Sequence, residues 1–274
     1  LIRRLYHDLT GLPPSLETIQ RFTNAQRPDA YHRLVDRLLA SPAFGERFGR
    51  HWLDVARYAD TVGYALGGKE RRYKGSERYR NWTIRSFAQD MPYDEMLRHQ
   101  LSADRTDPTN ENGNLEAMGF LTLGRQFLNP LDTIDDRIDV ITRGLLGLTV
   151  TCARCHDHKF DPISQVEYYQ LFAFFNNADE PRIEAPTAEV LVRRAEHGVR
   201  VKQLETELSA LAKEDAKRKP LGASLAKLKK ARPSAATTLV MAKRGKPRMT
   251  HRFVQGDFTR PAEEIQPGTP SVLH

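Results

Sequence analysis

The sequence predicts an all-α protein: a compact multi-helix domain with a protruding helical hairpin or coiled-coil arm and a short irregular or β-like C-terminal segment. Apolar residues recur at helical spacing through residues 1–180, the pattern narrows to a sparse heptad seam within 201–228, and β-like pieces follow residue 239. We therefore expect three parts. These are a helical domain over 1–180, a basic helical arm or linker over 181–238, and the start of a truncated C-terminal domain over 239–274.

The first helices are predicted from their start signals. Ser15 can cap one helix, and Ser41-Pro42 starts another in the preferred order of cap and then proline. Further helices are expected over 77–90 and 93–103. The helix after Pro42 is expected to bury one apolar face, made by Phe44, Phe48, His51, Trp52, Val55 and Tyr58.

A Cys-x-x-Cys-His run at residues 152–156 indicates the chemistry of the chain. In c-type haem attachment, two thiols bond the porphyrin vinyl groups and the following imidazole binds the iron. The run therefore predicts that Cys152 and Cys155 bind haem c and that His156 is the proximal iron ligand.

A long helix is expected to carry this run. Asp132 can cap the helix, one further turn of its apolar stripe leads to Cys152, and the proline of Asp161-Pro162 is expected to end it. Ser164 and Glu167 then have the spacing of a capping box that opens the next helix. The apolar stripe consists of Ile134, Ile138, Ile141, Leu145 and Leu148.

Three other interpretations of the two cysteines remain open. A thioredoxin-like redox pair needs a preceding strand, whereas a helix is expected here. A zinc site that uses His156 and His158 would crowd four ligands into seven residues. A plain disulfide suits an oxidising compartment but leaves His156 without a role.

The sixth iron ligand is predicted to be His51, the distal ligand, because this residue lies on the expected apolar face of its helix. His158 is the alternative metal ligand, and Met91, Met96 and Met118 are also available. Several charged residues are expected either to bind haem propionates or to form ion pairs between helices: Asp54, Arg57, Asp60, Asp135, Asp136 and Arg137.

The net charge of +7 is unevenly distributed. Residues 187–250 hold sixteen basic and six acidic residues and so carry +10, which leaves −3 on the rest. Two apolar seams separated by Pro220 predict two helices that pair as a hairpin or coiled coil. The first seam is Val201, Leu204, Leu208 and Leu211, and the second is Leu221, Leu225 and Leu228. Aromatic residues do not interleave these positive charges, so we expect a solvated arm without nucleic acid.

Three long motifs carry a family resemblance: Leu1-Ile2-Arg3-Arg4 through Asp8-Leu9-Thr10-Gly11-Leu12-Pro13-Pro14, Gly49-Arg50-His51-Trp52-Leu53-Asp54-Val55-Ala56-Arg57-Tyr58-Ala59-Asp60, and Asp135-Asp136-Arg137-Ile138-Asp139 leading to residues 152–163. They resemble the planctomycete cytochrome C-like domain, which has no defined function and usually lies between a smaller cytochrome-like module and a large C-terminal domain. The resemblance covers about 1–180 and implies haem and export. The loops at 67–75 and 104–114 depart from it, and Gly256-Asp257-Phe258 resembles the junction to the C-terminal domain.

The expected function is a haem c-binding electron-transfer domain of an exported multidomain protein. The alternative is a structural or other-metal-binding domain of an extracellular polymer-processing protein. Haem c is attached outside the cytoplasm, so we expect a periplasmic or extracellular location and an export signal upstream of Leu1. The expected partners are further domains of the same polypeptide, N-terminal and C-terminal to this chain, and a redox partner. No apolar run approaches the roughly 20 residues that span a bilayer.

Overall fold

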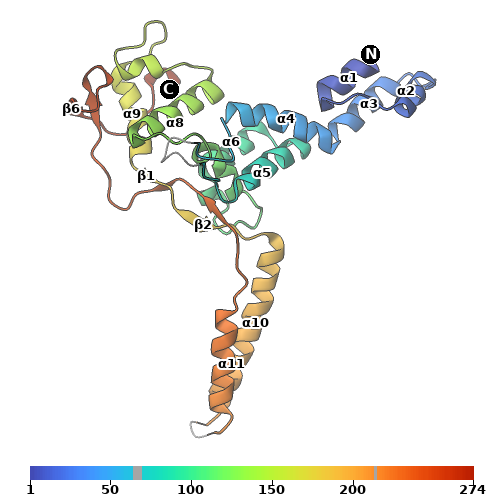
Figure 1. Cartoon of the computed structure of the whole chain (residues 1–274), viewed down its shortest axis with the longest axis vertical. Coiled ribbons are helices and arrows are strands. Elements are labelled where there is room, and N and C mark those ends of the chain that lie inside the picture. The colour runs from blue at the N-terminus through green and yellow to red at the C-terminus, as the bar shows by residue number, and fades with distance from the viewer. Residues whose placement is uncertain (64–69, 213–214) are drawn as a thin grey trace.

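The computed structural model describes residues 1–63, 70–212 and 215–274 and is mostly helical, as predicted (Figure 1). Residues 67–69, the first part of the loop at 67–75 that departs from the family resemblance, lie outside the described residues. The α-helices are α1 (Ile2–Thr10), α2 (Leu16–Thr23), α3 (Ala30–Leu39), α4 (Pro42–Val55), α5 (Ser76–Ala88), α6 (Tyr93–Thr106), α7 (Gly119–Thr122), α8 (Pro130–Leu146), α9 (Gln165–Asn176), α10 (Ala188–Ala210) and α11 (Arg218–Lys230).

Short elements connect these helices. The 3₁₀ helices are η1 (Leu115–Met118), η2 (Thr151–Arg154), η3 (Val254–Gly256) and η4 (Ser271–Leu273). The strands are β1 (Ala178–Asp179), β2 (Arg182–Glu184), β3 (Thr237–Leu239), β4 (Ala242–Lys243), β5 (His251–Phe253) and β6 (Pro261–Glu264). They form three antiparallel pairs, β1 with β4, β2 with β3 and β5 with β6.

The packing of α4 against α5 depends on two glycines. A Cβ atom added to Gly45 would lie 2.6 Å from the backbone oxygen of Ile84, and one added to Gly49 would lie 3.1 Å from Ile84 Cγ1. A side chain at Gly45 would therefore require the two helices to shift, and one at Gly49 would make the contact tighter than is usual in packed interiors. Within α4 the buried residues are Gly45 and Gly49. The aromatic residues of the predicted face are half-buried, and Trp52 and Tyr58 pack on the central core, whereas His51 and Val55 are exposed. The prediction of a buried face is therefore wrong for His51 and Val55.

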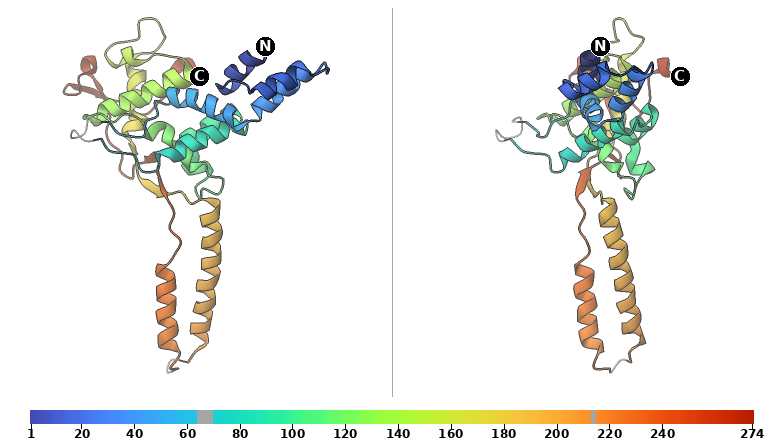
Figure 2. Two further views of the ribbon diagram at one scale, coloured as in Figure 1. Left: turned by 45° about the vertical axis from the view of Figure 1, so that its right-hand side comes forward. Right: turned by 90° about the vertical axis from the view of Figure 1, so that its right-hand side faces the viewer.

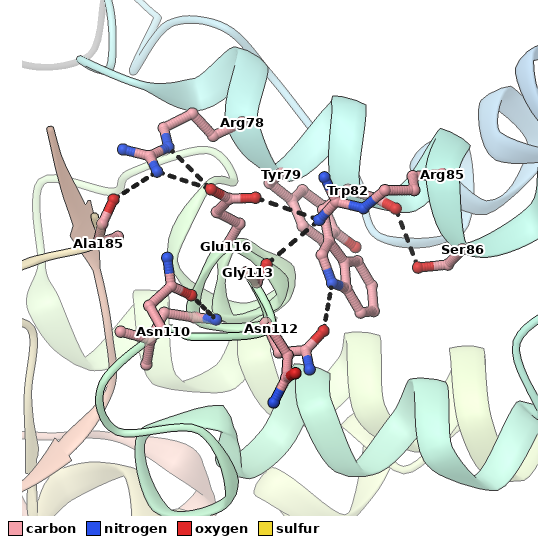
Figure 3. Close-up of polar contacts among 12 residues, drawn as sticks. Arg78, Tyr79, Trp82, Arg85, Ser86, Asn110, Asn112, Gly113, Glu116 and Ala185 are labelled. Carbon is pink, nitrogen blue, oxygen red and sulfur yellow. Dashed lines mark hydrogen bonds and ion pairs between the residues drawn. The ribbon is translucent and has the colours of Figure 1, made fainter. Parts of the chain in front are cut away.

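The central core forms around α5, where Trp82 and Tyr79 are almost completely buried. Trp82 Nε1 donates to Asn114 Oδ1 at 3.1 Å, so the buried indole is satisfied. Beside it, the Glu116 carboxylate lies between Arg78 at 2.6 Å and Arg85 at 3.5 Å (Figure 3). Arg78 also donates to the backbone oxygen of Ala185, which ties the chain before α10 to this core.

A second core joins α8 and α9 to the C-terminal segment. It contains Ile138 and Phe172 from the two helices, with Phe253, Phe258 and Ile265 from the end of the chain. Residues 251–265 therefore pack against the helical part described above. The interpretation of 239–274 as the start of a further domain stays a prediction.

The arm is a hairpin of α10 and α11 that projects from the body in every view (Figures 1 and 2). Its base is closed by β2 and β3, whose register pairs Arg182 with Leu239 and Glu184 with Thr237. The seam residues predicted from the heptads are each buried or half-buried, while most of their neighbours are exposed. Among the described helices, none has the length and apolarity needed to cross a membrane.

We predict that limited proteolysis cuts first within 181–240. Within the described parts of α10 and α11 only Leu225 is buried, so local unfolding of the arm requires little free energy. Leu225→Asp should accelerate this cleavage, and Ser224→Ala, on the exposed side of α11, should leave it unchanged. Mass spectrometry of early fragments checks the site, and early cleavage inside 132–160 would contradict this architecture.

Candidate functional site

The Cys-x-x-Cys-His run lies between α8 and α9. The predicted continuous helix over 132–160 is wrong, because α8 ends at Leu146 and Gly147 takes the left-handed conformation with φ 68°. A left-handed glycine is the usual way to end a helix. The start of α8 also differs from the prediction, since Asn129 caps Leu131 N and Pro130 is the first helical residue, whereas Asp132 lies inside the helix.

Cys152 lies within the short 3₁₀ turn η2, and Cys155 directly follows the last residue of this turn. Cys155 N donates to Cys152 O at 3.2 Å, and His156 N approaches the same oxygen at 3.4 Å. Both cysteines are exposed and neither forms a disulfide. The turn thus presents two free thiols on the surface, close to one another along the chain.

His156 presents one ring nitrogen for a metal. The residue is exposed, and its Nδ1 lies 2.7 Å from the backbone oxygen of Asp157. A carbonyl oxygen accepts only, so Nδ1 carries the proton in this contact. The lone pair is then on Nε2, which is the arrangement that metal-binding histidines usually have.

His158 has the opposite arrangement. Its side chain is only 6% exposed, and Nδ1 accepts from Asp161 N at 2.8 Å. Asp161 Oδ2 is farther from the same nitrogen, at 3.3 Å. Because Nδ1 accepts, the proton of the neutral ring is on Nε2 and no lone pair is free. The structure therefore does not support His158 as the alternative ligand, and over the described residues no three His, Cys, Asp or Glu side chains gather as a metal site.

Arg154, inside the run, fixes the turn to its surroundings. Its guanidinium lies 2.6 Å from Asp135 Oδ2 and 3.4 Å from Asp132 Oδ1, and it stacks over the Phe258 ring at 4.4 Å. Its backbone oxygen accepts from Tyr169 Oη at 3.0 Å. Burial raises the pKa of Asp135, while the Arg154 charge and a hydrogen bond from a neighbouring tyrosine hydroxyl favour the carboxylate.

The start of α9 closes the other side of the turn. Gln165 N donates to Asp157 Oδ1 at 2.8 Å, and Gln165 Nε2 donates to Arg154 O at 2.9 Å. The predicted capping box is confirmed, with Glu167 and Ser164 bonded reciprocally. Glu167 also accepts from Ser271 N at 2.8 Å, and these hydrogen bonds lower its pKa to about 2.

Residues 1–180 match the model of the family PSCyt2, described as a protein of unknown function (DUF1549). The chain belongs to this family. No curated protein and no solved structure matches the chain. The PSCyt2 match contains η2, α8 and α9, while the arm and the β5–β6 segment follow it in the sequence.

His51, which also lies within the PSCyt2 match, was expected to be buried on an apolar helix face, and it is not. The residue is exposed on α4, where its nearest aromatic neighbour is Phe48 at 6.1 Å between ring centroids. It follows the buried Gly49 by two residues, which is about 200° around a helix, so its side chain points away from the α4–α5 contact. The argument for His51 as a distal ligand, which assumed a buried ring, therefore fails.

The three methionines belong to other parts of the core. Met96 and Met118 are buried in clusters separate from the one that contains the Cys-x-x-Cys-His turn, and Met91 packs on the same cluster as Met96. Their packing accounts for their presence.

Four of the six charged residues singled out in the PSCyt2 motifs, Arg57, Asp135, Asp136 and Arg137, form ion pairs between elements, one of the two predicted roles. Asp60 instead accepts from Ser76 Oγ at 3.2 Å, and Asp54 is exposed. Arg57, just after α4, lies 2.6 Å from Asp136 of α8, and Arg137 pairs with Glu180. Burial lowers the pKa of Arg57 and raises the pKa of Asp136, and the opposite charge of each opposes the shift of the other. These pairs join α4 to α8 and α8 to the segment before the arm.

Sequence reasoning missed three residues of the site: Gln165, Gly256 and Phe258. In the sequence Gln165 only lies between the capping-box residues Ser164 and Glu167, and Gly256-Asp257-Phe258 only indicates a domain junction. The structure places all three against residues 154–155. A glutamine whose partners are backbone atoms distant in sequence leaves no local pattern to detect.

We predict that Glu167 makes stability depend on pH between about 4.5 and about 2. The folded-state pKa is depressed from 4.5, so its contribution is complete above 4.5 and is lost as the pH falls toward about 2. Glu167→Gln should lower the urea midpoint at pH 7 and flatten its decline between pH 5 and pH 2. Glu46→Gln, at an exposed position of α4, is the control; a Glu167→Gln curve parallel to wild type would disprove the linkage.

Proposed function

We propose that the chain is a haem c-binding domain that transfers electrons, with haem attached at Cys152 and Cys155 and His156 as the proximal ligand. The observation that supports it is the donor set itself. Two free, exposed thiols flank one tight turn, and the next residue offers an unprotonated Nε2 because Nδ1 is bonded to Asp157 O. These residue types and this spacing fit the requirements of covalent haem attachment.

The chain's own groups hold this donor set in place. Arg154 ties the turn to α8 through Asp135, and Gln165 and Tyr169 bond the Arg154 backbone oxygen from α9. The orientation of His156 is fixed by its contact with the Asp157 carbonyl. When bound, haem supplies an iron that changes between two oxidation states.

Exposure of the site favours electron transfer over a buried catalytic role. Cys152, Cys155 and His156 are all exposed, as is Phe160 with 84% of its surface accessible. A group attached there is within reach of a redox partner or of a neighbouring domain. A zinc site at the same residues is less well supported, because no three ligands converge within the described ranges.

The proposal includes export, because covalent haem attachment takes place outside the cytoplasm. We place the domain in a periplasmic or extracellular multidomain protein of the planctomycete cytochrome-like type, where adjacent domains or a separate protein exchange electrons with it. The arm is proposed to be a two-stranded antiparallel coiled coil, since its apolar seams face inward while its lysines and arginines are mostly exposed.

We predict that Cys152→Ala and Cys155→Ala each reduce covalent haem retention in a host with c-haem maturation. Each change removes one thioether, and the double variant should retain no covalent haem. The pyridine haemochrome spectrum of denatured, acid-acetone-extracted protein measures the retention. Ser102→Ala in α6, which removes a hydroxyl that donates to the Arg98 backbone oxygen at 2.8 Å, is a control that should retain wild-type haem. Covalent haem that persists unchanged in the double variant would exclude this attachment site.

We predict different effects for two histidines. His156→Ala removes the proximal ligand and should disturb the Soret band while the thioethers remain. His51→Ala should leave the spectrum unchanged, because His51 is exposed on α4. Absorption and electron paramagnetic resonance spectra distinguish the outcomes. A change from low spin to high spin in His51→Ala would instead support His51 as the sixth ligand.

A further inference from the structure

The C-terminal segment reaches the second cysteine of the run. At Gly256 the backbone has φ 75°, and an added Cβ would lie 2.8 Å from Cys155 Sγ and 3.1 Å from Arg154 Cγ. The preceding residue, Gln255, also has a positive φ, 54°. Two consecutive left-handed residues are uncommon, and they bring the backbone close to the sulfur atom.

Side-chain bonds hold this backbone in place. The Gln165 amide is 8% exposed and donates to two carbonyls, Arg154 O at 2.9 Å and Phe253 O at 3.1 Å. Arg252 Nη1 donates to Gln165 Oε1 at 2.9 Å. One buried amide therefore joins the cysteine turn to the strand that leads into Gly256.

Aromatic packing adds a second attachment. The Arg154 guanidinium lies 4.4 Å from the centroid of the Phe258 ring, and Phe258 meets Phe253 edge to face at 5.1 Å. Phe253 contacts Tyr169 of α9, at 5.5 Å. The β5–β6 hairpin, defined as residues 251–264, is thus fixed on both sides of its contact with Cys155.

The backbone of the β5–β6 hairpin therefore lies beside the Cys155 sulfur. Among the glycines of the described residues, Gly256 is the one whose added Cβ would meet a cysteine sulfur, and that sulfur belongs to Cys155. Both residues are exposed, so each thiol is open to solvent on some side. The hairpin covers one approach to Cys155.

We propose that the β5–β6 hairpin forms a second wall of the cysteine site and that Gly256 is a positioning residue that shields one side of Cys155. The two thiols then react at different rates, Cys152 faster than Cys155. This asymmetry is independent of haem. One consequence of the asymmetry rests on the proposed function: a haem that bonds both sulfurs would attach in a single orientation.

Alkylation of the full chain with iodoacetamide tests the proposal. The thiolate displaces iodide and forms one S–C bond, and the Cys155→Ala and Cys152→Ala variants each leave a single thiol to follow by mass spectrometry. Rates are compared at the high-pH plateau, where both thiols are ionised, so that access is separated from acidity. We expect the Cys152 thiol to react several-fold faster, and equal plateau rates would overturn the proposal.

Two substitutions test the hairpin itself. Gly256→Ala adds a methyl group against the sulfur and should slow Cys155 several-fold without changing Cys152. Gln165→Leu removes the amide link and should accelerate Cys155 alone. The matched control is Gly147→Ala, which has the same left-handed strain, φ 68°, but nothing within 4 Å of its added Cβ. If Gly147→Ala reproduces the change, or if both hairpin variants leave the rate ratio unaltered, the proposal is wrong.

Haem loading separates this proposal from the function above. Protein from a maturation-competent host that lacks covalent haem but keeps the unequal thiol rates would reject the haem site and retain the shield. Covalent haem on protein from that host, together with equal thiol rates in haem-free protein made without haem maturation, would do the reverse. If Gly256→Ala fails to fold, both of its thiols will react at the rate measured for urea-unfolded protein. The proposal is then tested by the ratio of the Cys152 and Cys155 rates in the wild-type background and by the effect of Gln165→Leu on the Cys155 rate.

Discussion

The rest of the site depends on the contacts of the Arg154 side chain. Arg154 lies between the two cysteines in sequence, yet its guanidinium bonds Asp135 of α8 and stacks on Phe258 near the end of the chain. Both members of this ion pair are half-buried, with 26% of the Arg154 side chain and 11% of the Asp135 side chain exposed. The short turn between α8 and α9 is therefore held by long-range contacts rather than by regular helical bonding.

This arrangement connects the family domain to the chain beyond it. The second core has aliphatic and aromatic side chains from α8 and α9. The C-terminal segment adds Ile265, which is buried in this core, and Phe253 and Phe258, which pack against it. These three residues follow the PSCyt2 match, which ends at residue 180. Apolar burial is the main force that closes such a core. The folding of the cysteine turn is thus coupled to residues that lie about one hundred positions later, on the far side of the arm.

The sequence could predict structure wherever the signal is local. The caps at Ser15 and Thr187 and the Ser164–Glu167 box are made by groups within four residues, and Ser15 and the box were foreseen correctly. Two predictions failed because of glycine. Gly147 ends α8 before the cysteines. Gly49 lies on the buried face of α4, but a residue without a side chain adds nothing to an apolar stripe, so the stripe does not reveal this face. The contact of Gly256 with Cys155 depends on tertiary folding, which no spacing rule describes.

The arm has a consequence for how such proteins can differ. The antiparallel pairs β1–β4 and β2–β3 bring its two ends together, so the body of the fold is closed by residues 178–184 and 237–243 without the helices between them. The 23 residues of α10 extend over about 35 Å at 1.5 Å per residue. Adding or removing matched turns in α10 and α11 would change this span without altering the cysteine turn. The arm is in this sense an element whose length can change while the cysteine turn stays the same.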